Sequence, residues 1–316
     1  MTLTIGVDVG GTKVAGGVVD EAGAILAKHR VGTPARDAEA TTTAIVEVID
    51  RLRAKHPEVT AVGVAIAGFV DAGRSVVYFA PNLLGWRDGP LRAEIEARVG
   101  LPTVVENDAN AAAWGESRFG AGSGFDHMVC VTLGTGVGGG IVLGGQLLRG
   151  GFGVAGEIGH IQMVEDGRLC GCGQRGCWEQ YASGGALIRA ARSRAAEARQ
   201  DAQLLLALGD GTPEGIEGRH VTEAAHRGDP VALAAFAEIS HWIGQGLADL
   251  AAVLDPQCFV LGGGVSEAGE LVLEPVRREF GHLLTGNGRR PLARVVLAAL
   301  ANEAGVAGAA DLARLG

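Results

Sequence analysis

The sequence predicts an α/β protein built from two related domains. Three observations predict it: strand patterns alternate with helix patterns, a strand–turn–strand unit occurs twice, and glycine-rich turns follow strands. Alternating strands and helices are typical of mixed sheets flanked by helices. The length of 316 residues is sufficient for two domains and a large core.

The duplicated unit opens the chain and returns near its middle. Residues 2–27 are expected to form a strand, a glycine turn, a strand, a turn and a strand. Residues 128–149 repeat that plan, and the alignment places Val7 on Val131. A repeat this long indicates two related domains, because the units of solenoid proteins have only about 20–50 residues.

Further helix and strand patterns complete the expected order. One helix begins at residue 108 or 109, where Asn107 and Asp108 can both cap it. The other helices are expected at residues 38–55, 89–99, 185–208, 221–227, 230–254, 267–284 and 302–314. The remaining strands are expected at residues 60–67, 103–105, 258–265 and 294–298. We expect the closing helix to pack back on the first domain.

Three glycine turns at strand ends favour a nucleotide site. Backbone N–H groups are unobstructed in such turns and hold phosphate oxygens well. Lys13 would add a positive charge, Thr12 and Thr135 hydroxyl donors, and Asp8 a carboxylate near a nucleotide-bound Mg²⁺. A single glycine turn equally fits a plain hairpin, so the prediction depends on all three. The candidate residues are Asp8, Gly10, Gly11, Thr12, Lys13, Gly134, Thr135, Gly136, Gly262, Gly263 and Gly264.

Two other nucleotide motifs match only superficially. Residues 134–139 satisfy G-x-G-x-x-G, but the dinucleotide fingerprint opens a helix, and this segment continues as a strand. Residues 6–13 nearly form a P-loop, but Thr12 precedes Lys13, whereas the motif requires lysine before the hydroxyl residue. We therefore expect neither NAD nor a P-loop.

A cluster of cysteines suggests a metal site. Cys170, Cys172 and Cys177 lie within eight residues, and His160 lies shortly before them. Three thiolates and one imidazole form the donor set of a closed tetrahedral zinc site. Disulfides, free buried thiols and a redox pair are the alternatives. Zinc is favoured because no basic, apolar leader opens the chain, so we expect a reducing cytoplasm.

Charge and hydropathy argue against nucleic acid and membrane partners. The chain has 27 basic and 36 acidic residues, a formal net charge of −9, and no basic block. The apolar run AVGVAIAGFV is too short to span a bilayer. Glycine supplies 52 residues, more than twice its average share of about 7%.

The motifs DVGGTK, LGTGVGGGIV, EIGH and CGCGQRGCWE together resemble the ROK family, over essentially the whole chain. That family comprises bacterial sugar kinases, sugar-responsive repressors and uncharacterised reading frames. The resemblance implies the actin-like, hexokinase-like (ribonuclease H-like) fold, with two α/β domains around a cleft. It also implies a smaller domain of residues 1–108 plus 301–316, and a larger domain of residues 109–300.

The resemblance further implies ATP-dependent phosphorylation of glucose at its 6-hydroxyl, with Asp108 as the catalytic base. The glycine turns would hold ATP with Mg²⁺, and zinc would be structural, with His160, Cys170, Cys172 and Cys177 as its ligands. The residues implied to contact the sugar are Gly68, Asn107, Asp108, Glu157, His160 and Glu179. A homodimer or homotetramer is expected.

Several alternatives stay open at this point. Other sugars are N-acetylmannosamine, N-acetylglucosamine, fructose, mannose and allose, and polyphosphate could be the phosphoryl donor. A sugar-responsive repressor is disfavoured, because only seven residues precede Asp8, leaving no room for a helix-turn-helix. An inactive scaffold is disfavoured because Asp108, the carboxylates and the metal donors are all present. Trp86 and Trp178 could stack on a sugar ring, although a buried tryptophan is the favoured interpretation.

Overall fold

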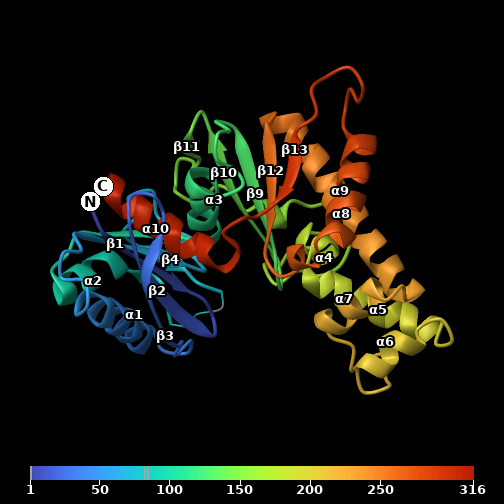
Figure 1. Ribbon diagram of the computed structural model, residues 1–316, viewed down its shortest axis with the longest axis horizontal. Coiled ribbons are helices and arrows are strands. Elements are labelled where there is room, and N and C mark those ends of the chain that lie inside the picture. Colours follow the sequence, from blue (N-terminus) through green and yellow to red (C-terminus); the bar gives the residue numbers. More distant parts are fainter. Residues whose placement is uncertain (1, 82, 84) are drawn as a thin grey trace. The chain divides into compact units, whose positions relative to one another are not determined.

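The computed structural model describes residues 2–81, 83 and 85–316. Within them the chain forms two five-stranded sheets and one three-stranded sheet, with helices between the strands (Figure 1). The α/β class is therefore confirmed. The chain divides into two compact units, one of residues 1–130, 139–156 and 298–316, the other of residues 131–138 and 157–297. The predicted domain boundaries at residues 108 and 300 stay a prediction.

The first sheet has the strand order β3-β2-β1-β4-β8. Its strands are β1 (Thr4–Val9), β2 (Lys13–Val19), β3 (Ile25–Gly32), β4 (Ala61–Ile66) and β8 (Thr103–Asn107). Strands β1, β2 and β3 pair antiparallel, whereas β4 lies parallel to both β1 and β8. Every residue of β4 is buried, as expected for a parallel strand covered on both faces.

Strand β8 is longer than the sequence predicts. The sequence predicts a strand that ends at residue 105. In the structure Glu106 pairs with Ala65 of β4, and its side chain is only 1% exposed. A carboxylate is tolerated inside a sheet when ionic and hydrogen-bonding partners compensate its burial.

Among the described residues, four α-helices belong to this unit: α1 (Ala38–Arg53), α2 (Leu91–Val99), α3 (Asp108–Phe119) and α10 (Ala304–Leu315). Helix α1 covers one face of the sheet, where a Cβ on Gly16 would clash with Val48 of α1. Helix α10 covers the other face, and a Cβ on Gly63 would lie 1.8 Å from the carbonyl oxygen of Ala309. The prediction that the closing helix returns to the first domain is confirmed.

A small sheet of β5 (Phe69–Val70), β6 (Val77–Phe79) and β7 (Arg87–Gly89) follows β4. The sequence did not predict it, because strands of two or three residues carry no alternation that can be recognised. Gly68, at the start of this segment, is buried, and a Cβ there would lie 2.9 Å from the carbonyl oxygen of Phe79.

The second sheet repeats the plan of the first. Its order is β11-β10-β9-β12-β13, which matches β3-β2-β1-β4-β8 position by position. Its strands are β9 (Met128–Leu133), β10 (Val137–Leu143), β11 (Gln146–Leu147), β12 (Cys258–Gly262) and β13 (Arg294–Leu297). The duplication read from the sequence is therefore present in the strand order.

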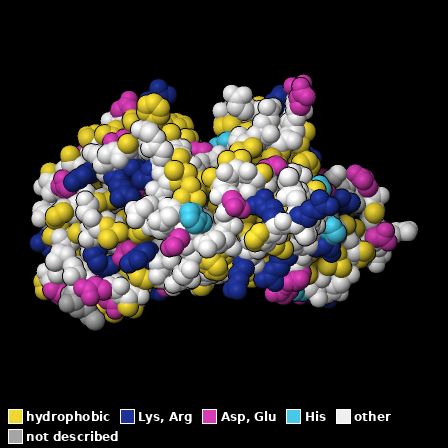
Figure 2. Space-filling model, turned by 90° about the horizontal axis from the view of Figure 1, so that it is seen from above, with side chains coloured by type: hydrophobic (Ala, Val, Ile, Leu, Met, Phe, Trp, Pro, Cys, Tyr) yellow, Lys and Arg dark blue, Asp and Glu magenta, His cyan; other side chains and the backbone are white. Residues whose placement is uncertain are grey.

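The second unit carries six α-helices among its described residues, and the longest, α8, is capped by the Asp229 side chain and has Pro230 in its first turn. The helices are α4 (Glu179–Ala182), α5 (Gly184–Glu197), α6 (Gln203–Leu208), α7 (Gly218–His226), α8 (Pro230–Leu254) and α9 (Glu270–Leu283). Among the described residues, no helix combines the length and apolar character that crossing a bilayer requires. On the face drawn in Figure 2, Lys and Arg side chains lie in several separate groups with Asp and Glu among them.

Candidate active site and metal centre

The junction of β8 and α3 presents the predicted catalytic carboxylate. The Asn107 side chain is the cap of α3: its Oδ1 accepts from the backbone N–H of Asn110 at 3.0 Å. Its Nδ2 donates to the carbonyl oxygen of Gly68 at 3.1 Å. Asp108 is the first residue of the helix, and its Oδ1 accepts from the backbone N–H of Ala109 at 2.9 Å. Asn107 therefore caps the helix, and the Asp108 carboxylate is available for chemistry.

Burial raises the pKa of Asp108, although backbone hydrogen bonds to the carboxylate oppose the shift. Asp8 lies at the carboxyl end of β1, and its pKa is raised from 3.8 to about 6. Burial is the main cause, the negative charge of Asp108 adds to it, and the Lys13 ammonium opposes it. Two interacting carboxylates with raised proton affinity suit proton acceptance and binding of a divalent cation.

The first glycine turn is held by its neighbour strand and is open on its outer side. The Gly10 N–H donates to the Lys13 carbonyl oxygen at 3.0 Å, closing the turn. Thr33 fixes it from the side, since its hydroxyl donates to the Gly10 carbonyl oxygen at 2.7 Å. The side chains of Thr12 and Lys13 are exposed. This turn can therefore receive a phosphate.

The other two glycine turns meet inside the second unit. The Gly134 N–H donates to the Gly136 carbonyl oxygen at 3.0 Å. The segment after β12 folds against the end of β9, where the Val265 N–H donates to the Leu133 carbonyl oxygen at 2.9 Å. Gly263 has φ +81°, and a Cβ there would lie 2.6 Å from the same oxygen. Only glycine fits this close approach of two backbones.

A pocket of about 610 Å³ opens beside these two turns. The start of α5 forms one side, since the Gly184 N–H donates to the Gly134 carbonyl oxygen at 2.8 Å. Its apolar walls are Leu187, Ile188, Val265 and Ala268, and its charged or polar rim contains Arg219, Thr222, Glu223, His226 and Glu267. This size and mixture suit a small aromatic heterocycle with attached polar groups. Sequence reasoning missed these residues, apart from the neighbouring turns.

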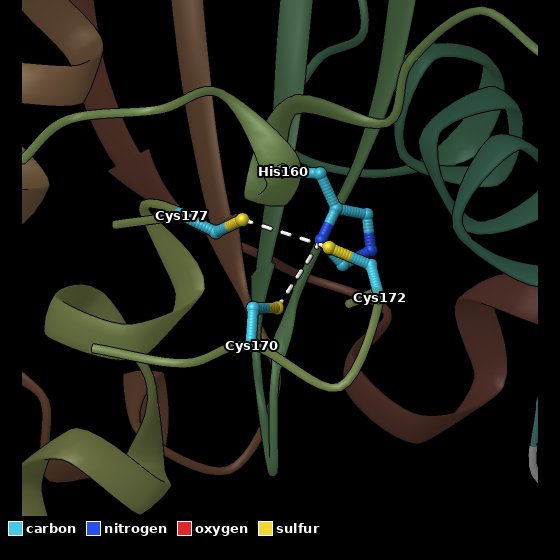
Figure 3. A group of neighbouring side chains, drawn as sticks. All are labelled: His160, Cys170, Cys172 and Cys177. Atoms are coloured by element: carbon cyan, nitrogen blue, oxygen red, sulfur yellow. Dashed lines mark hydrogen bonds between the residues drawn. The ribbon is translucent and has the colours of Figure 1, made fainter. Parts of the chain in front are cut away.

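The predicted metal ligands converge in the second unit (Figure 3). One donor atom from each of His160, Cys170, Cys172 and Cys177 lies within 4.8 Å of the other three. The Cys172 and Cys177 sulfurs are 3.6 Å apart, and the Cys170 sulfur is 3.6 Å from Nδ1 of His160. Ligands about 2.0–2.3 Å from a tetrahedral zinc ion would stand roughly 3.5–3.8 Å apart, and the two 3.6 Å spacings match that value.

The thiols are crowded in a way that a dication would relieve. Burial and then the neighbouring thiols raise the pKa of Cys177 to about 12. Cys177 and Cys170 are buried, whereas Cys172 is exposed. Thiolates held this closely need a positive charge between them, which a coordinated metal ion supplies.

Glu179 connects the cysteine cluster to the glycine turn after β9. Its Oε2 accepts from the Val137 N–H at 3.2 Å, and its Oε1 lies 3.6 Å from the Cys170 sulfur. A Cβ on Gly136 would lie 2.0 Å from the same carboxylate, so a larger residue there would displace the Glu179 side chain. Glu157 is exposed and precedes the short 3₁₀ turn Ile158–His160 that carries the histidine ligand.

The ROK family sequence model matches residues 4–315. The chain belongs to the ROK family. A glucokinase of Streptomyces coelicolor is 57% identical over 314 residues, covering 99% of this chain and 98% of the relative. An N-acetylmannosamine kinase of Yersinia pseudotuberculosis is 36% identical over 264 residues, covering 84% and 83%. A ROK family glucokinase from Streptomyces griseus, solved in complex with glucose and AMPPNP, is 57% identical with a TM-score of 0.90, covering 99% and 100%.

The ROK motif residues fall into two groups by unit. Gly68, Asn107 and Asp108 lie together in the first unit, where Asp8 is close enough to Asp108 to feel its charge. His160 and Glu179 lie together with the three cysteines in the second unit.

Two tryptophans near these ROK motifs belong to the core. Trp178 is fully buried, and its Nε1 donates to the Trp242 carbonyl oxygen at 2.7 Å. Trp86 is 6% exposed. The favoured interpretation of both as buried side chains is confirmed, so neither is available to stack on a sugar.

Proposed function

We propose that this ROK family protein transfers the terminal phosphoryl group of ATP to the 6-hydroxyl of glucose, with Asp108 as general base. The observation that carries the choice of glucose is the 57% identity, over nearly the whole length, to a glucokinase and to a structure with glucose and AMPPNP bound. Asp108 is half-buried, and the raised pKa of its carboxylate supports the proposed role in proton transfer.

In the proposed reaction, the 6-hydroxyl oxygen of glucose attacks the terminal phosphorus of ATP. The O–H proton passes to the Asp108 carboxylate as the new P–O bond forms, and the bond between that phosphorus and ADP breaks. General-base assistance of this kind contributes about 10²–10⁴-fold. Burial increases the proton affinity of Asp108, which makes it a better acceptor than an exposed aspartate. Most of the remaining acceleration comes from alignment and charge neutralisation.

We propose that ATP lies on the glycine turns. The 134–136 and 262–264 turns present backbone N–H groups to its phosphates, and the 610 Å³ pocket beside them receives the adenosine. Ile188 and Leu187 would flank the base, and Arg219 or His226 would meet polar groups at the rim. Lys13 and Thr12 are exposed on their turn and would contact phosphate oxygens. Asp8 would hold the Mg²⁺ that accompanies ATP.

The sugar contacts are proposed from both groups of motif residues. Asn107, Asp108 and the backbone of Gly68 would bind hydroxyls from the first unit, and Glu157, His160 and Glu179 from the second. Nδ1 of His160 faces the cysteines, which leaves Nε2 for a hydroxyl. Zinc, when bound by His160 and the three cysteines, would be structural, because four protein ligands leave no open position.

Other members of the family act on other sugars, as the N-acetylmannosamine kinase relative illustrates. A site built to hydrogen-bond particular hydroxyls rejects epimers strongly, so the preferred sugar is measurable as a ratio of kcat/KM values. The test is a coupled ADP-release assay over glucose, mannose, fructose, allose, N-acetylglucosamine and N-acetylmannosamine, with ATP or polyphosphate as donor. We expect glucose with ATP to be the best pair.

Asp108→Asn is the matched variant, because it removes the base while preserving shape. We expect a loss of kcat of at least about 10²-fold with glucose affinity changed much less. Wild-type kinase activity that survives in Asp108→Asn would refute the role of Asp108. A preference for an N-acetylated hexosamine would refute the choice of glucose.

A further inference from the structure

Behind the Asn107–Asp108 corner lies a buried carboxylate to which the proposed reaction assigns no role. Glu106 is the penultimate residue of β8, and its side chain is 1% exposed. Its Oε1 accepts from the backbone N–H of Asn107 at 3.0 Å and from Nδ2 of Asn110 at 3.2 Å. The carboxylate therefore contacts both residues of the Asn107–Asn110 capping pair.

Two arginines neutralise this carboxylate. Nε of Arg74 donates to Oε2 of Glu106 at 3.0 Å. Nε of Arg149 lies 2.8 Å from the same oxygen but is oriented too obliquely for a hydrogen bond, so that contact is ionic. A carboxylate buried this deeply is stable only with such compensation, and removing one partner is costly. The triad is therefore a rigid element.

Arg149 extends the triad to the turn that follows Gly68. Its Nη1 and Nη2 donate to the carbonyl oxygens of Ala72 and Asp71, each at 2.8 Å. The Asp71 carboxylate in turn accepts from the N–H groups of residues 73, 75 and 76. Three separate segments of the first unit, residues 68–76, 104–110 and the one around Arg149, thus meet at Glu106.

We propose that Glu106 is a positioning residue for sugar phosphorylation, acting through Asn107 and Asp108. Its Oε1 holds the Asn107 backbone N–H, and its partner Arg149 holds the carbonyl oxygens of Asp71 and Ala72, three and four residues after Gly68, so both segments joined by the Asn107–Gly68 hydrogen bond are anchored at Glu106. The inference rests on the proposed function. A misplacement of about 1 Å in a reacting group can cost about 10²-fold in rate, so such support has a measurable effect.

The test compares Glu106→Gln with Asp311→Asn. Glutamine preserves the shape of Glu106 but removes the charge that holds Arg74 and Arg149. Asp311 on α10 is a matched control, because it is also buried (2% exposed) and paired with two arginines, Arg118 of α3 and Arg314 of α10. Both variants should unfold at lower temperature than the wild type. Only Glu106→Gln should lower kcat/KM for glucose, by about 10–100-fold, and weaken glucose binding measured calorimetrically without nucleotide.

A double-mutant cycle with Asn107→Ala tests the route. If Glu106 acts through Asn107, the fold-decrease in kcat/KM of the double variant should be much smaller than the product of the fold-decreases of the two single variants. If Glu106→Gln fails to fold, Arg149→Lys is tested in its place. Lysine keeps the positive charge but loses the paired hydrogen bonds to the carbonyl oxygens of Ala72 and Asp71, so KM for glucose should rise several-fold.

Two results would overturn the proposal. The first is a Glu106→Gln or Arg149→Lys variant that loses thermal stability but keeps wild-type kcat, KM and glucose affinity. The second is a double variant with Asn107→Ala whose fold-loss of activity equals the product of the two single fold-losses. The proposed function fails differently, since it fails in the wild type: no hexose of the panel is phosphorylated.

Discussion

Asp8→Asn should stabilise the folded protein at neutral pH while impairing its activity. The pKa of Asp8 is raised from 3.8 to about 6, mainly by burial and then by the charge of Asp108. The folded state therefore binds this proton more tightly than the unfolded chain does. The stability that Asp8 contributes is fully present below pH 3.8 and is lost as the pH rises through 6.

The size of the effect follows from the shift. About two pKa units correspond to about 3 kcal/mol at 1.36 kcal/mol per unit, and because Asp8 keeps some contact with solvent, we expect about 2–3 kcal/mol. For a chain of this length, that difference raises the Tm by roughly 3–5 °C. The Asn variant should therefore be more stable than the wild type at pH 8, and the two should converge at pH 4.

The assay is thermal or urea unfolding from pH 4 to 8, without nucleotide or Mg²⁺. Asp71→Asn is a control of opposite sign. Burial alone would raise the pKa of Asp71, but hydrogen bonds from Val76, Ser75 and Gly73 outweigh it and hold that pKa below its usual value. This variant should be less stable than the wild type at pH 8 and approach it at low pH. The reasoning is refuted if Asp8→Asn is no more stable than the wild type at pH 8. It is also refuted if the variant exceeds the wild type in stability by the same amount at pH 4 and at pH 8.

Three further predictions address ligands and metal. Cys172→Ser should lower zinc content, Tm and glucose affinity together, as measured by metal analysis, calorimetry and KM for glucose. A variant with full metal content and a wild-type KM would contradict this coupling of the metal site to sugar binding. Ile188→Trp should fill the pocket beside the 134–136 turn and raise KM for ATP by about tenfold or more without changing glucose binding; an unchanged KM for ATP would remove adenosine from that pocket. The acid limb of kcat/KM should lie above the range of an ordinary exposed aspartate, because burial raises the pKa of Asp108; a limb within that range would contradict this.

The parts of the fold with strong local patterns could be predicted from the sequence. The paired β1–β2 and β9–β10 units were recognised because apolar strands and glycine turns recur at a constant offset. The small β5–β6–β7 sheet was missed because its strands are too short to show a period. Strand β8 was ended too early because Glu106 resembles a surface residue until Arg74 and Arg149 are seen beside it.

The candidate site also has parts that could be predicted from the sequence and parts that could not. The four metal donors were predictable because three of them are close in sequence. The pocket was not predictable, since Arg219 and His226 on α7 line it together with Gly134 only through the packing of distant segments. The proximity of Asp8 and Asp108, a hundred residues apart, likewise depends on the parallel alignment of β1, β4 and β8.

The place of α10 in the first unit has a consequence for biosynthesis. The face of the first sheet that contains Gly6 and Gly63 packs against this helix, which ends at residue 315. At about 5–20 residues per second, a ribosome needs roughly 10–30 s to travel from the end of the unit's earlier portion to α10. During that interval the backbone at Gly6 and Gly63 lacks the helix that packs against it in the folded protein. A chain that terminates before α10 should therefore expose this face and aggregate more readily than the full-length protein.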